Sequence, residues 1–149
     1  MNIGDKIPQS LGFDMNGNEV LSSQFAGKKL VIYFYPKDNT PGCTAEACSF
    51  SNEYSQLRNA GYEIIGISKD SAKSHKKFAE KYSLPFTLIS DVDLKLNQEF
   101  GVWREKKMCG RTSMGTVRTT FVTDTDGIIP HIISKVDTKH AANQILELK

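Results

Sequence analysis

The stretch that decides the fold is Pro36–Cys48, which reads PKDNTPGCTAEAC. It follows LVIYFY at residues 30–35, an apolar and β-branched run with the length of a buried strand. Pro36 ends that strand. Downstream, apolar residues recur in steps of three and four from Ala47 to Leu57, which predicts one face of a helix. Cys43 extends that face backward by four residues, so we expect its thiol in the first helical turn, pointing toward the sheet.

The first turn of a helix favours an ionised sulfur. Its N–H groups have no partner inside the helix, and the helix dipole places partial positive charge there. Both effects favour a thiolate at Cys43. Ionisation alone raises the reactive fraction of a cysteine at pH 7 only about 30-fold. A fast thiol therefore also needs donors aimed at the atom under attack, and the hydroxyl of Thr40, in the same turn, is a candidate.

The second cysteine of the stretch, Cys48, lies five residues after Cys43. On an ideal helix this spacing separates the two Cα atoms by roughly 8.7 Å. A disulfide requires less than about 7 Å. Either the two cysteines never pair, or the first turns of the helix unwind to let the sulfurs meet.

The pattern Pro36-x-x-x-Thr40-x-x-Cys43 resembles the active-site motif of the peroxiredoxins, and the longer string PKDNTPGCTAEAC is similar to the bacterioferritin-comigratory (PrxQ) subgroup. The resemblance implies a thioredoxin-like fold and an antioxidant thiol peroxidase that reduces hydrogen peroxide and alkyl hydroperoxides. It also implies that Cys43 is the peroxidatic cysteine and that Cys48 resolves its sulfenic acid as an intramolecular disulfide. Thioredoxin or a glutaredoxin would then reduce that disulfide, and no metal, haem or flavin cofactor is expected.

The local stretch supplies no positive charge for the thiolate, and Arg118 in GTVRTTF is the candidate. We expect it on a strand, with Val117 and Thr119 facing the other way. It matches the family's active-site arginine, which also lies on a strand after a glycine loop. A guanidinium beside Cys43 would stabilise the thiolate and donate hydrogen bonds to a peroxide oxygen. Pro36 is expected to shield the thiolate by packing.

The basic segment at residues 104–116, REKKMCGRTSMGT, is expected to be a loop or a strained turn. Arg104 and Arg111 within it are weaker alternatives to the strand arginine. Cys109 departs from the simplest pattern of the subgroup and lies amid basic residues that favour its thiolate. It is an incidental exposed thiol, an alternative resolving partner or a regulatory thiol.

Other chemistries fit the sequence less well. The three cysteines and three histidines show no paired ligand spacings, so no metal site is expected and the histidines are expected at the surface. Glu46 is expected to be a structural carboxylate near the helix start. The alternative function is a general thiol–disulfide oxidoreductase on the same fold, although such enzymes usually carry Cys-x-x-Cys. A binding module with incidental thiols is the third possibility.

Composition limits the remaining classes. The 149 residues, 39% hydrophobic and 24% charged, suit a single domain spanning residues 1–149. A net charge of +2 is too small to indicate binding to nucleic acid or to an anionic membrane. The N-terminus resembles no signal peptide and no run approaches 18 apolar residues, so the cytoplasm is the expected compartment. A monomer is the simplest expectation, because an intramolecular cysteine pair needs no partner subunit.

The expected elements follow the order of a thioredoxin-like α/β fold, with a mixed central sheet flanked by helices and an N-terminal β-hairpin. Asn16–Gly17 is the hairpin signal. Pro130 indicates that the last strand is an edge or bulged strand. The expected strands are residues 30–35, 63–68, 86–90, 116–123 and 128–135; the expected helices run from the cysteine turn to residue 60, from 71 to 82, up to residue 100, and from 138 to 148.

Overall fold

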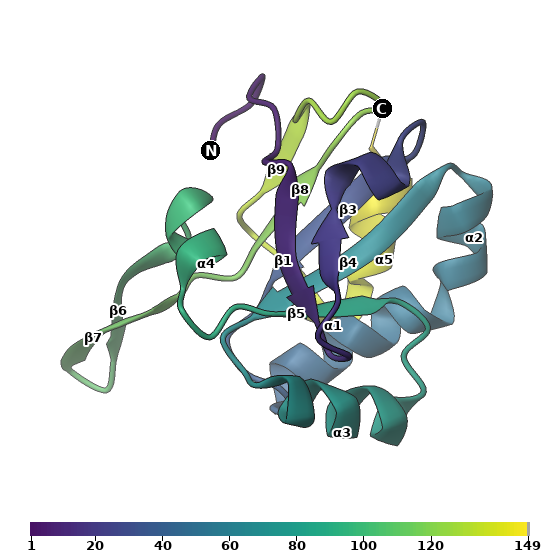
Figure 1. The fold of residues 1–149 in the computed structure, drawn as a ribbon. Helices are drawn as coiled ribbons and strands as arrows, with labels where there is room; N and C mark the ends of the chain where they lie inside the picture. The colour runs from purple at the N-terminus through teal and green to yellow at the C-terminus, as the bar shows by residue number, and fades with distance from the viewer. Residues whose placement is uncertain (149) are drawn as a thin grey trace.

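The computed structural model describes residues 1–148 and contains a seven-stranded mixed sheet with helices on both faces (Figure 1). The strand order is β2-β1-β5-β4-β3-β8-β9. Strands β3, β4 and β5 are parallel, and the other neighbours in the sheet pair antiparallel. The strands of this sheet are β1 (Ser10–Asp14), β2 (Glu19–Leu21), β3 (Lys29–Phe34), β4 (Tyr62–Ser68), β5 (Thr87–Ser90), β8 (Thr119–Val122) and β9 (His131–Ile133).

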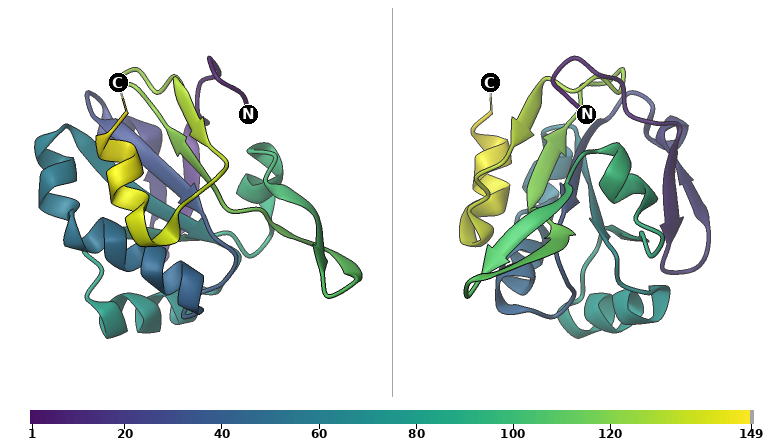
Figure 2. Two further views of the ribbon diagram at one scale, coloured as in Figure 1. Left: turned by 180° about the vertical axis from the view of Figure 1, so that it is seen from behind. Right: turned by 90° about the vertical axis from the view of Figure 1, so that its left-hand side faces the viewer.

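The helices complete the arrangement expected from the sequence. Figure 2 shows α5 beside α1 on one face of the sheet, where the N–H of Ala142 donates to Ser49 Oγ at 3.1 Å. The thioredoxin-like fold, the mixed sheet and the N-terminal hairpin are confirmed. No helix within residues 1–148 is long and apolar enough to cross a membrane. The helices are η1 (Ser22–Phe25), α1 (Pro41–Asn52), α2 (Tyr54–Asn59), α3 (Ala72–Tyr82), α4 (Lys95–Glu99), η2 (Thr138–His140) and α5 (Ala141–Leu146).

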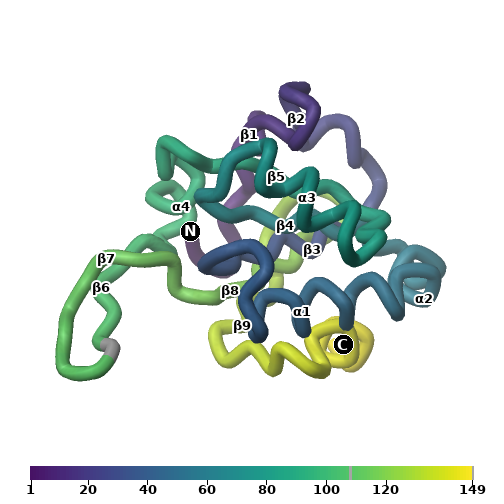
Figure 3. Tube along the Cα trace, turned by 90° about the horizontal axis from the view of Figure 1, so that it is seen from below, coloured from purple at the N-terminus to yellow at the C-terminus, as the bar shows by residue number. Residues whose placement is uncertain are grey.

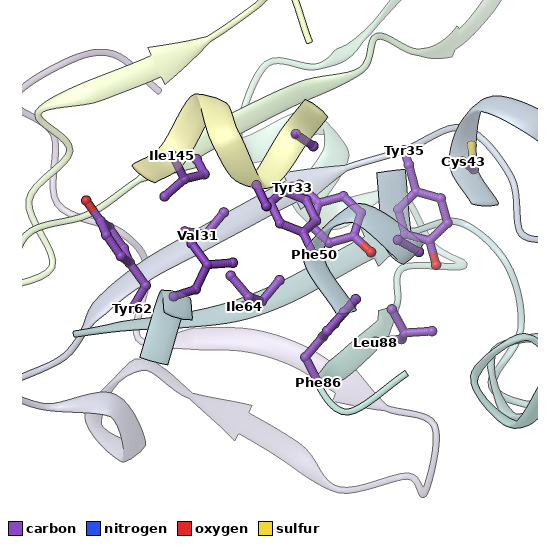
Figure 4. Packing of buried hydrophobic residues seen from close by; sticks show 14 of the residues in the cluster. Val31, Tyr33, Tyr35, Cys43, Phe50, Tyr62, Ile64, Phe86, Leu88 and Ile145 are labelled. Atoms are coloured by element: carbon purple, nitrogen blue, oxygen red, sulfur yellow. The ribbon is translucent and has the colours of Figure 1, made fainter. Parts of the chain in front are cut away.

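Strand β3 lies inside the sheet and is buried on both faces, which explains its unbroken apolar sequence. Val31 and Tyr33 belong to the core cluster beneath α1 (Figure 4). Ile32 and Phe34 point to the opposite face and belong to a second cluster, which also contains residues of α4 and of the N-terminal segment. Because β3 is fixed from both sides, its carboxyl end is a rigid support for the loop that precedes α1.

The helix that carries the two cysteines is shorter than predicted. Helix α1 ends at Asn52, and a separate helix, α2, begins at Tyr54 after Glu53, whose ψ of 14° departs from helical geometry. The last turn of α1 reads SFSN, in which three of four residues have low helix propensity and compete for backbone hydrogen bonds. The apolar periodicity continues across the break, which is why the sequence predicted one helix to residue 60.

The prediction of a loop or strained turn at residues 104–116 is wrong. Strands β6 (Trp103–Met108) and β7 (Arg111–Thr116) form an antiparallel hairpin, separate from the main sheet. It extends away from the body of the protein in Figures 1 and 3. Cys109 and Gly110 form its two-residue turn with φ angles of 52° and 77°, the positive values that a tight hairpin turn requires. The strands are mostly polar on both faces, so the alternation that normally predicts a hairpin is absent.

Two further boundaries differ from the prediction. Strand β8 begins at Thr119, so Arg118 lies in the link between β7 and β8 and not on a strand. Strand β9 is only three residues long, and it is an edge strand that follows Pro130, as that proline indicated.

Candidate active site

The thiol of Cys43 lies where the sequence placed it, in the first turn of α1. Thr40 is the N-cap residue, Pro41 occupies the first helical position, and Cys43 is the third residue of the helix. Its side chain is buried, with 1% relative exposure, at one end of the core cluster (Figure 4). The N–H of Thr44 already donates to the Thr40 carbonyl at 2.8 Å. The N–H groups of Gly42 and Cys43 are therefore the first-turn donors without an intrahelical acceptor.

Arg118, which lies 75 residues after Cys43 in the sequence, contacts this thiol. Its Nη2 donates to Cys43 Sγ at 3.4 Å. The register of the sheet explains the approach, because Phe34 at the end of β3 pairs with Thr119 at the start of β8. Arg118 therefore emerges at the edge of the sheet where α1 begins. A Cβ atom at Gly42 would lie 3.2 Å from Arg118 Nη2, so the glycine of the TPGC segment gives the guanidinium room.

Glu46 fixes the guanidinium from the helix side. Its Oε1 accepts from Arg118 Nη1 at 2.6 Å, and its side chain has no exposed surface. Burial raises the pKa of Glu46 to about 7, although the Arg118 charge acts in the opposite direction. Among residues 1–148, Glu46 Oε2 has no hydrogen-bond partner. The two guanidinium nitrogens thus bridge a buried carboxylate and the Cys43 sulfur.

Glu46 was expected to be a structural carboxylate, but its position on the helix also indicates a buried charge that needs a partner. It lies three residues after Cys43, on the same inward face of the helix. A carboxylate on a buried face requires a charged or hydrogen-bonding partner. That partner is the arginine that the sequence assigned to Cys43 alone.

Thr40 and Pro36 lie in the loop at residues 36–40, between β3 and α1. The Thr40 hydroxyl donates to the Lys37 carbonyl at 2.9 Å, so in this conformation its proton is directed along the loop and its oxygen is left as an acceptor. Pro36 is half-buried at the end of β3, and its carbonyl accepts from Lys69 Nζ at 3.0 Å. Both residues shape the loop that sets the entry to α1.

The three cysteines all carry free thiols. Cys48 lies on α1 with Cys43, and its side chain is half-buried. Because both residues lie within one intact helix, the expected Cα separation stays beyond disulfide range. Cys109 is exposed at the turn of the β6–β7 hairpin.

One histidine contradicts the expectation of surface positions. His75 on α3 is fully buried, and its Nδ1 lies 2.7 Å from Asp38 Oδ2 in the loop at residues 36–40. The helical spacing contained the signal, because His75 precedes Phe78 by three residues and Ala79 by four, and both of these are buried. Asp38 was not singled out from the sequence at all.

Comparison with known proteins agrees with this geometry. The family model described as "AhpC/TSA family" matches residues 3–132. A putative peroxiredoxin bcp of Coxiella burnetii is 46% identical over 135 residues, which cover 90% of this chain and 89% of the relative. The peroxiredoxin Bcp of Bacillus subtilis is 43% identical over 148 residues, covering 99% and 94% of the two chains.

Solved structures give the same assignment. A mutant of PrxQ from Xylella fastidiosa superimposes with a TM-score of 0.89 at 33% identity, covering 98% of this chain and 93% of that one. The bacterioferritin comigratory protein of Xanthomonas campestris, studied for its alkyl peroxide reduction activity, gives a TM-score of 0.83 at 38% identity, covering 90% and 85% of the chains. The chain therefore belongs to the AhpC/TSA family, among the Bcp/PrxQ peroxiredoxins. The thiol-dependent peroxidase predicted from the sequence is confirmed at this level.

Proposed function

We propose that Cys43 is the peroxidatic nucleophile. Its thiolate attacks the terminal oxygen of a hydroperoxide, the O–O bond breaks, and water or an alcohol leaves while the sulfur becomes sulfenic acid. Arg118 Nη2 donates to that sulfur, and the N–H groups of Gly42 and Cys43 in the same helical turn have no intrahelical acceptor, so these donors can stabilise the negative charge that moves along the O–O bond. The observation that carries this proposal is the 3.4 Å contact between Arg118 Nη2 and Cys43 Sγ.

Thr40 and Pro36 complete the proposed site. The Thr40 hydroxyl oxygen can accept a hydrogen bond from a protonated peroxide oxygen while its own proton stays on the Lys37 carbonyl. Pro36 shields the thiolate by packing at the end of β3. Hydrogen peroxide and alkyl hydroperoxides are the proposed substrates, and the activity of the Xanthomonas relative toward alkyl peroxides supports the second class.

Cys48 is the proposed resolving residue. The thiol of Cys48 condenses with the Cys43 sulfenic acid, a disulfide forms, and water is released. The condensation requires the first turns of α1 to unwind, because the two residues lie on one helix. An external dithiol, thioredoxin or a glutaredoxin, then reduces the disulfide by exchange. The intramolecular pair supports a monomer as the working unit, and the cytoplasm is the proposed compartment.

The test is a rapid-mixing measurement of peroxide consumption with the Cys43→Ser and Cys48→Ser variants. Cys43→Ser should abolish turnover, and full activity in that variant would overturn the proposal. Cys48→Ser should reduce one equivalent of peroxide and then stall when thioredoxin is the only reductant. Unchanged steady-state turnover in Cys48→Ser would refute its resolving role while leaving Cys43 in place.

A further inference from the structure

The loop at residues 36–40 is held by a buried carboxylate that the peroxide chemistry does not use. Asp38 is 7% exposed. Its Oδ1 accepts from the Tyr35 hydroxyl at 2.6 Å, and its Oδ2 accepts from Ser74 Oγ at 2.8 Å and lies 2.7 Å from His75 Nδ1. Its own N–H donates to Asp70 Oδ2 at 2.9 Å. Asp38 is thus joined to α3 and to the link before it.

The hydrogen bonds around His75 fix its protonation. Its Nε2 lies 2.9 Å from the Ile89 carbonyl, which can only accept, so Nε2 carries a proton. Its Nδ1 lies 2.7 Å from Asp38 Oδ2 and 3.5 Å from the Tyr35 hydroxyl, and that hydroxyl already donates its proton to Asp38 Oδ1, so a second proton lies between Nδ1 and Oδ2. Burial opposes the charge on Asp38, but hydrogen bonds from His75 and Tyr35 hold the pKa of Asp38 below its ordinary value. Together these contacts describe a buried imidazolium of α3 paired with a carboxylate of the loop.

Other hydrogen bonds that connect the loop to its neighbours are exposed to solvent. Lys69 Nζ donates to the Pro36 carbonyl, and Lys81 Nζ and the Tyr82 hydroxyl donate to Asn39 Oδ1 at 3.3 and 3.1 Å. Solvent-exposed contacts of this kind contribute little to stability. Asp70 is a further acidic residue near the pair. One of its carboxylate oxygens lies within 4.8 Å of a carboxylate oxygen of Asp38 and of a ring nitrogen of His75. Lys73, Lys77 and Lys81 line the cavity of about 410 Å³ beside Asp38.

Only four residues separate Asp38 from Cys43, and one of them is the conformationally stiff Pro41. If Asp38 stays fixed, Cys43 has little freedom to leave its place beside Arg118. We propose that Asp38 and His75 are positioning residues whose ion pair anchors the loop and thereby sets how readily the first turn of α1 unwinds for Cys48. This inference rests on the proposed resolving role of Cys48.

The anchor has a measurable chemical consequence. The Cys43 sulfenic acid either condenses with Cys48 or meets a second hydroperoxide, which oxidises it to sulfinic acid while that peroxide is reduced to water or alcohol. A weaker anchor favours the unwound helix start, so disulfide formation accelerates and sulfinic acid decreases. A hydrogen bond to a charged group has the strength to change that rate by about tenfold to hundredfold. A merely structural defect would not protect the enzyme against peroxide.

The experiment follows sulfenic acid, sulfinic acid and disulfide by rapid quenching, alkylation and mass spectrometry at rising hydrogen peroxide concentrations. His75→Leu removes both the charge and the donor, whereas His75→Asn keeps a neutral donor for Asp38. Val20→Ala is the matched control, because it loses buried packing in the cluster on the opposite face of the sheet. We expect disulfide formation to accelerate most in His75→Leu, less in His75→Asn and not at all in Val20→Ala. Resistance to over-oxidation should follow the same order.

The outcomes separate the two proposals. If Cys43 is not oxidised in the unmodified protein, the proposed function fails. If Cys43 is oxidised but His75→Leu forms the disulfide no faster than Val20→Ala, the anchor is refuted. An independent check that needs no variant is ¹⁵N NMR of the His75 ring at neutral pH. Protons on both ring nitrogens are expected, and a neutral ring would overturn the ion pair.

Discussion

Replacing Glu46 with glutamine tests whether a buried carboxylate binds Arg118. The burial of Glu46 determines how large the effect on the unfolding free energy should be. The unfolded chain releases the Glu46 proton near the ordinary pKa of 4.5, whereas the folded chain releases it near pH 7, because the carboxylate is buried. Between these values the native state binds more protons than the unfolded state, so the contribution of Glu46 to the unfolding free energy falls as pH rises. The difference in pKa corresponds to about 3 kcal/mol. Glu46→Gln keeps the shape and an acceptor for Arg118 but cannot ionise.

Urea unfolding of the reduced protein from pH 4.5 to pH 8 measures this contribution. The unfolding free energy of the unmodified protein, minus that of Glu46→Gln, should decrease by about 3 kcal/mol as pH rises to 7 and then remain level. This difference removes the contributions of the other titratable groups, because both proteins contain them. If the unfolding free energies of the two proteins stay parallel from pH 4.5 to pH 8, Glu46 is not a buried carboxylate with a raised pKa. The proposed pairing of Glu46 with Arg118 would then be wrong.

Two further predictions concern the contacts of Arg118, and a third concerns the start of α4. Arg118→Met should slow oxidation of Cys43 by hydrogen peroxide about 100- to 1,000-fold in stopped-flow measurements, since it removes a donor to the reacting atoms; a change of less than threefold would contradict that role. Gly42→Ala should slow the same step about tenfold, because the added Cβ would lie 3.2 Å from Arg118 Nη2, and an unaltered rate would mean that the guanidinium moves freely. Asp91→Ala should lower the unfolding free energy by about 3 kcal/mol, because its buried carboxylate accepts from the N–H groups of Leu96 and Asn97 at 3.0 and 2.8 Å at the start of α4; urea denaturation with a loss below 1 kcal/mol would show that these bonds are dispensable.

The features predicted correctly from the sequence are those encoded locally. Strand β3 is a short apolar run ended by Pro36, and the start of α1 is encoded by Pro41 and the apolar spacing after it. The sequence predicted that Asp70 or Ser71 caps α3, and Ser71 is the cap, with its Oγ accepting from the N–H of Ser74 at 3.1 Å. These signals depend on a few neighbouring residues, so they survive without knowledge of the tertiary structure.

Two of the features that were not predicted from the sequence depend on contacts between distant segments, whereas the third, the β6–β7 hairpin, is local. The pairing of Glu46 with Arg118 joins residues 72 positions apart and is created by the register of β3 and β8. The burial of His75 depends on the loop at residues 36–40 meeting α3. The β6–β7 hairpin lacks an apolar face, so its strands carry little of the alternation that identifies a hairpin.

The most direct test of the account is to map the disulfides formed after one equivalent of hydrogen peroxide. Reduced protein is oxidised, its remaining thiols are alkylated, and the digested peptides are identified by mass spectrometry, with Cys109→Ser as the matched control. We expect a Cys43–Cys48 linkage within one chain, an alkylated Cys109, and the same linkage in Cys109→Ser. A bond between Cys43 and Cys109, or an alkylated Cys48 beside an oxidised Cys43, would contradict the claim that α1 unwinds to join its two sulfurs.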